Sequence, residues 1–174
     1  MSFAIRPLRT DEAELYREVR LEALRMHPDG FSASFEQEAA QPPGFFVDRL
    51  TGSVVFGGFP APDLPGPDIL GPDLLGIAGF TVQAGAKSKH KGALWGMYVR
   101  PSARRSGLSR LLVEAVLDHA RQLVELVQLS VVADNLNARR LYASLGFEPY
   151  GFEPRALKLE ERYLDFVLMA KRLI

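Results

Sequence analysis

The spacing of apolar and polar residues along the chain predicts alternating strands and helices. Apolar side chains recur every three to four residues over 10–25 and 107–123, which is typical of helices with one buried face. Shorter helices are predicted over 31–40, 43–50 and 137–145. Runs rich in branched and aromatic side chains predict strands over 4–7, 53–59, 75–83, 94–99, 127–132, 155–159 and 163–169. Pro and Gly residues predict loops over 60–72 and 149–154.

The connections between these elements predict how the strands pair. Up to residue 99 the connections are short enough for antiparallel neighbours. The strand 127–132 follows a helical crossover, so we expect it to lie parallel to 94–99 with a right-handed connection. The sequence therefore predicts a single α/β domain over 1–174. Its sheet is mixed and mostly antiparallel, with one parallel central strand pair and helices on both faces.

Composition narrows the class of protein. The chain has 174 residues, of which 47% are hydrophobic and 24% charged, as expected for one globular domain. It contains no cysteine, which excludes disulfides, thiolate catalysis and zinc–thiolate sites. The N-terminus lacks the apolar core of a signal peptide, and no stretch reaches the roughly 20 apolar residues that span a bilayer. A net charge of zero argues against general nucleic-acid binding. We therefore expect a cytoplasmic protein without membrane, nucleic-acid or metal partners.

Basic residues are concentrated in the middle of the chain. The segment from Leu74 to Val113 contains no Asp or Glu, and its basic residues are Lys87, Lys89, Lys91, Arg100, Arg104, Arg105 and Arg110. Within it, the strand 94–99 leads through an Arg/Ser/Gly loop into the helix that begins near Gly107. Unpaired N–H groups and the dipole at such a helix start favour an anion such as a phosphate. A solvated basic hairpin is the alternative interpretation of the charge alone.

Two sequence blocks resemble the GNAT superfamily of acyl-CoA-dependent N-acetyltransferases. The first, MYVRPSARRSGLSRLL, is similar to the family's strand, Gln/Arg-x-x-Gly-x-Gly/Ala loop and helix, with Arg104, Gly107 and Ser109 at the motif positions. The second, SVVADNLNARRLYASLGFEPYG, is similar to a later block of the family through Asn135, Ala138, Leu141, Tyr142, Gly146 and Phe147. The resemblance implies a GNAT-like fold whose parallel central strands splay apart. It also implies transfer of an acetyl group from acetyl-CoA to a primary amine through a tetrahedral intermediate.

The same resemblance implies the residues of the site. The pyrophosphate of acetyl-CoA is expected on the loop formed by Arg104, Arg105, Ser106, Gly107, Leu108 and Ser109. Arg105 and Arg110 are candidate phosphate ligands by position and charge. The pantetheine arm is expected to lie along Met97, Tyr98 and Val99 like an added strand, and to contact Asn135. Tyr142 is expected to give a proton to the departing thiolate. The alternative is that Tyr142 is a core aromatic residue.

The general base and the acceptor are less well specified. The strand 94–98 contains no carboxylate, which leaves Glu36, Glu38, His90 or a water chain as candidate bases. The acceptor is expected to be a small-molecule or peptide amine. The regions expected to contact the acceptor contain acidic residues, which favour a cationic acceptor. Ordinary solvated acids at the surface would explain these residues equally well. They are Glu36, Glu38, Glu153, Glu160 and Glu161.

Two other classes of function stay open. One is a non-catalytic acyl-CoA-binding sensor or interaction module on the same fold, which the missing strand carboxylate favours. The other is a different nucleotide-binding domain, which is disfavoured because the chain has neither a G-x-G-x-x-G nor a G-K-[ST] loop. A homodimer is a further expectation by analogy with the family, with exposed apolar strand residues such as Phe166 and Leu168 as candidate contacts.

Overall fold

One mixed sheet forms the centre of the computed structural model, which describes residues 2–61 and 73–174. Its strands are β1 (Phe3–Pro7), β2 (Val54–Pro60), β3 (Gly76–Val82), β4 (Lys91–Val99), β5 (Leu126–Val132), β6 (Glu148–Leu159) and β7 (Arg162–Arg172). Their order is β1-β2-β3-β4-β5-β7-β6, and every neighbouring pair is antiparallel except β4 with β5. The predicted mixed sheet with a parallel central pair is confirmed. Most of the Pro-rich loop predicted over 60–72 lies outside the described residues.

The parallel strands β4 and β5 pair over a short stretch and then separate. Their register runs from Lys91 with Leu126 to Ala93 with Gln128. β4 continues to Val99 without a strand partner on this side, whereas β5 stays paired with β7 along its whole length. The two strands therefore diverge toward their carboxyl ends, and we call this region the splay.

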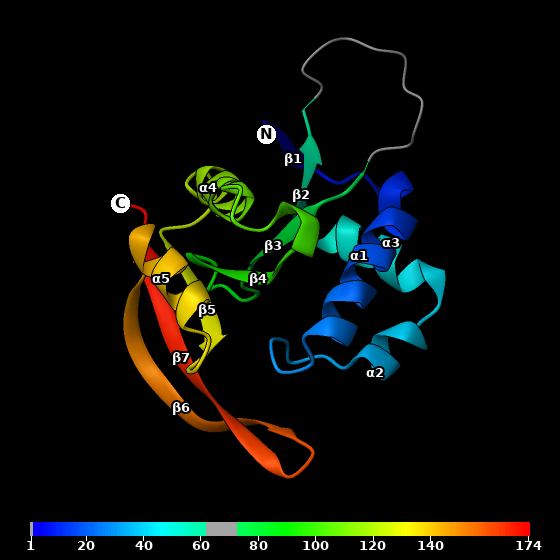
Figure 1. The fold of residues 1–174 in the computed structure, drawn as a ribbon. Helices are drawn as coiled ribbons and strands as arrows, with labels where there is room; N and C mark the ends of the chain where they lie inside the picture. Colours follow the sequence, from blue (N-terminus) through cyan, green and yellow to red (C-terminus); the bar gives the residue numbers. More distant parts are fainter. Residues whose placement is uncertain (1, 62–72) are drawn as a thin grey trace.

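Helices cover both faces of the sheet, as predicted (Figure 1). One face carries α4 (Leu108–Ala120) and α5 (Leu136–Ser144), and the other carries α1 (Ala13–Met26), α2 (Phe35–Ala39) and α3 (Pro43–Gly52). Each face has its own hydrophobic cluster. β3 contributes to both, with Ile77 in the cluster of α1 and Ala78 in the cluster of α4, the alternation expected of a strand buried on both faces.

Several predicted boundaries are wrong. The helix predicted over 31–40 is limited to α2, because Ser34 caps its start and accepts a hydrogen bond from the N–H of Gln37. The first helix does not begin at Thr10, because a 3₁₀ turn, η1 (Thr10–Glu12), precedes α1. The loop predicted over 149–154 is part of β6. Proline is tolerated in β6 because this strand lies at the edge of the sheet, and bulges after Pro149 and Glu153 absorb the remaining irregularity.

Residues 2–61 and 73–174 contain no group of three or more His, Cys, Asp or Glu side chains that could hold a metal ion. No helix in these ranges is long and apolar enough to cross a membrane. Phe166 and Leu168, predicted as exposed dimer contacts, are only half-exposed on β7. The more exposed aromatic side chains at this edge are Tyr150 and Phe152 on β6.

Leu112 and its neighbour Leu111 provide a test of how α4 packs. Leu112 is fully buried, whereas Leu111 is 38% exposed. We expect Leu112→Ala to lower the free energy of unfolding by about 2–5 kcal/mol, because it leaves a cavity in the core. We expect Leu111→Ala to lower it by less than about 1 kcal/mol. Urea denaturation followed by circular dichroism measures both, and equal losses would contradict the described packing.

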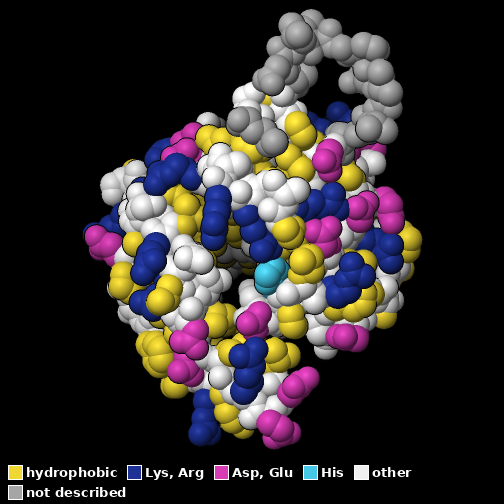
Figure 2. All heavy atoms as spheres, viewed as in Figure 1, with side chains coloured by type: hydrophobic (Ala, Val, Ile, Leu, Met, Phe, Trp, Pro, Cys, Tyr) yellow, Lys and Arg dark blue, Asp and Glu magenta, His cyan; other side chains and the backbone are white. Residues whose placement is uncertain are grey.

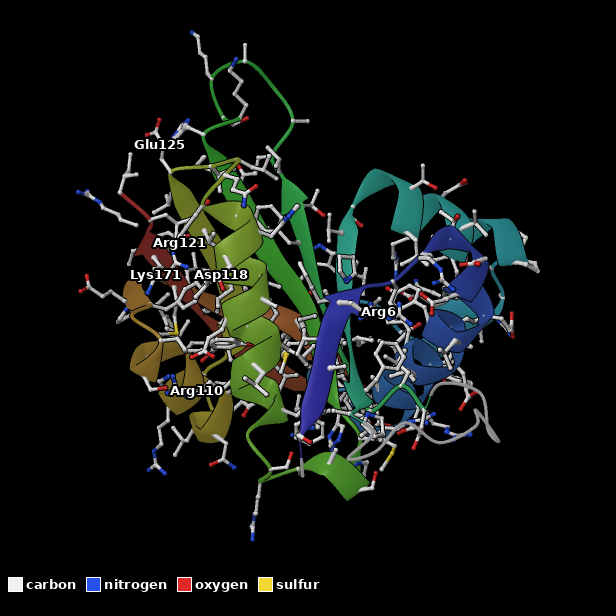
Figure 3. All side chains as sticks on the ribbon, turned by 90° about the horizontal axis from the view of Figure 1, so that it is seen from above. Arg6, Arg110, Asp118, Arg121, Glu125 and Lys171 are labelled. Carbon is white, nitrogen blue, oxygen red and sulfur yellow. The ribbon has the colours of Figure 1, made fainter. Side chains whose placement is uncertain are left out.

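The carboxylate of Glu12 makes stability depend on pH. Arg6, labelled on β1 in Figure 3, donates two hydrogen bonds to it, at 2.8 Å and 2.6 Å. These bonds lower the pKa of Glu12 from 4.5 to about 2. Glu12 therefore loses its proton more readily in the folded protein than in the unfolded chain. Its stabilising contribution to folding is complete above the pKa of the unfolded chain and is lost as the pH falls through the pKa of the folded protein.

We therefore expect the unfolding free energy of the unmodified protein to fall more steeply than that of Glu12→Gln between about pH 5 and pH 2. Denaturant titrations at several pH values measure the two slopes. Parallel slopes would mean that the ion pair with Arg6 does not favour the folded state.

Candidate functional site

A bulge in β4 lies where this strand loses contact with β5. The register of β3 against β4 shifts between Trp95 and Tyr98, so that Gly96 and Met97 together face a single residue of β3. Gly96 has φ +63°, a left-handed conformation that glycine adopts without steric cost. The bulge therefore bends β4 at the beginning of the splay.

Beyond the bulge, β4 has an open edge. The N–H of Arg100 donates to the carbonyl of Leu75, on the β3 side, at 2.8 Å. Backbone N–H and carbonyl groups of successive residues in a strand point to opposite sides, so those of Val99 point away from β3, toward the splay. The Val99 carbonyl there accepts a hydrogen bond from Nε of Arg104 at 3.1 Å. The segment predicted to receive the pantetheine arm is thus an open backbone edge, although the side chains of Tyr98 and Val99 are buried.

The loop before α4 has backbone N–H groups without an acceptor in the described part of the chain: those of Arg105, Ser106, Gly107 and Ser109. Arg105 and Gly107 have left-handed backbones, with φ of 60° and 90°. Such conformations can turn successive N–H groups toward a common anion, and α4 adds the positive end of its dipole. A Cβ on Gly107 would meet no atom within 4 Å, and the buried Leu108 anchors the helix start. The loop therefore has the donors and the space that a diphosphate group needs.

The arginine side chains near this loop are used in different ways. Besides its bond to the Val99 carbonyl, Arg104 has Nη2 2.7 Å from Nε2 of His27. Arg110, near the start of α4 in Figure 3, donates to Glu114 at 3.2 Å and to a serine hydroxyl of α5 at 2.8 Å. The guanidinium group of Arg105 has no partner within the described residues. Arg105 is therefore the arginine of this loop whose side chain is free for a ligand.

Asn135 caps α5 with its side chain. Its Oδ1 accepts a hydrogen bond from the N–H of Ala138 at 3.1 Å, a contact typical of an N-cap asparagine. The residue is exposed and lies just past the carboxyl end of β5, the end at which β4 and β5 diverge. Its side-chain NH₂ group has no acceptor among the described residues and can donate to a ligand.

The side chain of Tyr142 lies in the cluster between α5 and the sheet. It is 6% exposed and packs edge-on against Phe147, with ring centroids 5.8 Å apart. Burial raises the pKa of Tyr142 to about 12, and the hydroxyl has no hydrogen-bond partner within residues 2–61 and 73–174. Met97 of the bulge packs against the same cluster. Tyr142 is thus packed as a core aromatic residue, with a protonated hydroxyl that is free to donate.

A cavity of about 630 Å³ lies where β4 and β5 diverge. Its walls come from Ala93 to Gly96 of β4, from the carboxyl half of β5, from the segment after α1 and from side chains of α1, α2 and α3. None of the residues predicted to hold the cofactor lines it, although Gly96 directly precedes Met97. Figure 2 shows this side of the molecule hollowed, with Lys and Arg side chains above the hollow and a His and an acidic side chain at other parts of its rim.

Three charged side chains from separate helices form a buried network at this cavity. Glu38 on α2 accepts hydrogen bonds from Nε and Nη2 of Arg20 on α1, at 3.0 Å and 2.9 Å. Glu38 also accepts from Nη1 of Arg49 on α3, at 3.0 Å and 3.1 Å. Burial by itself raises the pKa of Glu38, but the two guanidinium groups outweigh burial and keep the pKa below its ordinary value. No spacing in the sequence signals this network, because its members are far apart along the chain.

The network removes Glu38 from the candidate bases, because both of its oxygens are engaged by guanidinium groups. His90 is exposed and precedes β4, at the end where this strand is still paired with β5. Glu36 is exposed and does not line the cavity. The other acids that favoured a cationic acceptor are exposed as well: Glu153, Glu160 and Glu161. The described cavity offers no free carboxylate, which leaves a water chain as the candidate base.

Comparison with known proteins identifies the family of the chain. Residues 12–147 match the model of the acetyltransferase (GNAT) family, which is more than three quarters of the chain. The chain therefore belongs to the GNAT family of acetyl-CoA-dependent N-acetyltransferases. No curated protein matches the chain by sequence.

Solved structures share the whole fold. A GNAT-family acetyltransferase from Streptococcus pneumoniae has a TM-score of 0.80 at 22% identity, over 98% of this chain and 99% of that chain. The yncA protein of Salmonella typhimurium, solved with its cofactor acetyl-CoA, has a TM-score of 0.76 at 19% identity, over 100% and 95%. The ribosomal-protein-S18-alanine N-acetyltransferase from Escherichia coli has a TM-score of 0.71 at 18% identity, over 99% and 94%.

Two substitutions at Gly107 test the anion site. Asn and Asp are nearly equal in size, and both tolerate a left-handed backbone better than most residues. If the loop binds phosphate, Gly107→Asp places a negative charge beside it. We expect the affinity for acetyl-CoA to fall at least ~10-fold further in Gly107→Asp than in Gly107→Asn. Isothermal titration calorimetry measures both affinities, and equal values would show that the phosphates bind elsewhere.

Proposed function

We propose that the protein transfers the acetyl group of acetyl-CoA to a primary amine, by direct attack of the amine through a tetrahedral intermediate. One observation carries this proposal: the open edge of β4 leads directly into the loop whose N–H groups lack acceptors. An extended arm bound along the edge can therefore end in a diphosphate bound at the loop. The free thioester end of the arm then lies near the bulge and the cavity.

The binding roles in this proposal follow from the free donors. The N–H groups of the loop and the side chain of Arg105 hold the diphosphate, with the dipole of α4 behind them. The β4 edge from Met97 to Val99 pairs with the pantetheine arm like an added strand. The NH₂ group of Asn135 donates to the same arm from the other side of the splay. Arg104 positions the loop, because its guanidinium group ties the loop to the Val99 carbonyl.

When bound, acetyl-CoA supplies an activated acetyl group as a thioester, and the chain provides the donors around it. A backbone N–H of β4 stabilises the negative charge that develops on the acetyl oxygen. Tyr142 holds a proton at its hydroxyl, since its pKa is about 12. This pKa lies above the value of about 8.5 for a thiol, so Tyr142 stabilises the departing sulfur mainly by donating a hydrogen bond. The amine gives its proton to water, because the described cavity has no free carboxylate.

A non-catalytic acyl-CoA sensor is the second candidate function. The observation that favours it is the engagement of Glu38, the carboxylate that lines the described cavity, by two arginines. An enzyme would release the CoA thiol when acetyl-CoA is mixed with a suitable amine, whereas a sensor would bind acetyl-CoA and release none. Calorimetry followed by a thiol-release assay over a broad amine panel separates these outcomes.

Tyr142→Phe tests the catalytic role. The ring remains in the core and only the hydroxyl is lost, so we expect kcat to fall about 10- to 1000-fold while acetyl-CoA affinity changes little. Tyr163→Phe removes a hydroxyl from an exposed residue of β7 and serves as the control, with unchanged kcat expected. Steady-state thiol release measures both variants. An unchanged kcat in Tyr142→Phe would leave Tyr142 with a structural role alone.

A further inference from the structure

The cavity at the splay carries more positive than negative charge. The charged side chains among its described lining residues are Arg20, Glu38 and Arg49, so their formal charges leave an excess of one positive charge. The side chains of Arg20 and Glu38 are 7% and 5% exposed, and that of Arg49 is 22% exposed. A partly buried positive charge without a full counterion costs free energy, which an anionic ligand would offset. The cavity is therefore suited to an anionic group.

Both guanidinium groups have donors left for such a group. Arg20 uses Nε and Nη2 on Glu38, and its Nη1 has no acceptor within the described chain. Arg49 uses only Nη1, which leaves Nε and Nη2 free. Its guanidinium carbon lies 4.5 Å from the ring centroid of Phe45 and 5.6 Å from that of Trp95, and these contacts hold it in place. The free Nε and Nη2 of Arg49 form a pair of parallel donors that matches the geometry of a carboxylate, and Nη1 of Arg20 adds one further donor.

The free donor of Arg20 lies beside the β4 bulge. Its Nη1 is 3.5 Å from the position that a Cβ on Gly96 would take. In the proposed function the thioester is held at this part of β4. If an anionic group of the acceptor binds Arg20, that group lies close to the thioester. The amine that attacks the thioester must therefore be only a few bonds away from the anionic group. Polyamines have no such group, and a peptide N-terminus has its carboxylate too far away.

We propose that the acceptor is a free α-amino acid or a close analogue, whose carboxylate binds the free donors of Arg20 and Arg49. This proposal rests on the proposed function. The cavity of about 630 Å³ has aromatic side chains in its wall, including Phe31, Trp95 and Phe166, which fit the side chain of such an acceptor. The neutral α-nitrogen adds to the acetyl carbon and forms the tetrahedral intermediate, and the C–S bond breaks when this intermediate collapses. The nitrogen gives its proton to water, and the departing thiolate takes a proton from water.

The experiment compares each amino acid with its carboxamide and its decarboxylated amine. The panel of the 20 common L-amino acids and these derivatives is assayed for release of the CoA thiol. We expect at least one amino acid to have a kcat/KM about 10- to 100-fold above that of its carboxamide, the ratio that charge-assisted hydrogen bonds to a carboxylate would give. Carboxamides or decarboxylated amines that match the acids throughout the panel would overturn the proposal, as would an absence of turnover with every acid.

Variants of Arg49 test the site itself. In Arg49→Met, Arg20 and Glu38 remain paired and the charge excess is lost. We expect the KM for the preferred amino acid to rise at least ~10-fold while the KM for its carboxamide stays within about twofold. Arg121→Met removes one exposed charge at the end of α4 and should change neither value. If Arg49→Met does not fold, Arg49→Lys keeps the charge but loses the fork, and a smaller selective rise in KM is expected.

The failures of the two proposals are distinguishable. Turnover of amines without any preference for a carboxylate would leave the acetyl-transfer function intact and remove the acceptor class. Binding of acetyl-CoA without thiol release from any amine would remove the proposed transfer function itself. Equal rises in KM for the acid and its carboxamide in Arg49→Met would show that Arg49 only supports the fold of the cavity.

Discussion

The site depends on an interrupted pairing between two parallel strands in the middle of the sheet. Backbone N–H and carbonyl groups left unpaired in a protein interior cost free energy unless water or a ligand satisfies them. The gap stays open because the bulge at Gly96 bends β4 away, while pairing with β7 on its other edge keeps β5 in the sheet. The opening is therefore part of the framework, and a ligand that brings its own strand-like polar groups fits it without rearrangement of the sheet.

One helix links the open edge of β4 to the cavity. The hydroxyl of Tyr98 donates to Glu22 of α1 at 2.9 Å; burial and this carboxylate raise the pKa of Tyr98 to about 12, so the hydroxyl stays protonated. Arg100, just past β4, forms ion pairs with Glu18 and Glu22 at 2.5 Å and 3.0 Å. The same helix carries Arg20, whose Nη1 reaches the bulge. The contacts that fix α1 against the end of β4 therefore also fix the position of the free guanidinium donor.

The features that could be predicted from the sequence are those encoded within one continuous segment of the chain. The period of α4, the preceding strand and the glycine loop lie in one continuous segment, and the helical crossover predicted the parallel pair that the structure confirms. The prediction of a loop over 149–154 was wrong because Pro and Gly usually indicate turns. β6 accepts them because it lies at the edge of the sheet, and that position depends on how the whole sheet assembles. Gly96 within a strand was the available signal for the bulge. The Arg20–Glu38–Arg49 network had no such signal, since three helices must pack before its members meet.

The two halves of the site share one electrostatic character. The loop before α4 offers free N–H groups, the side chain of Arg105 and a helix dipole, and the cavity on the other side of the bulge holds two arginines against one glutamate. In the two proposals the diphosphate and the carboxylate lie at opposite ends of the extended pantetheine arm, so each needs a positive environment of its own. The charge excess in the cavity is the feature that would let a second anion bind beside coenzyme A. A neutral or cationic acceptor would gain nothing from it, which is why the arginines carry more information about the acceptor than the exposed acids do.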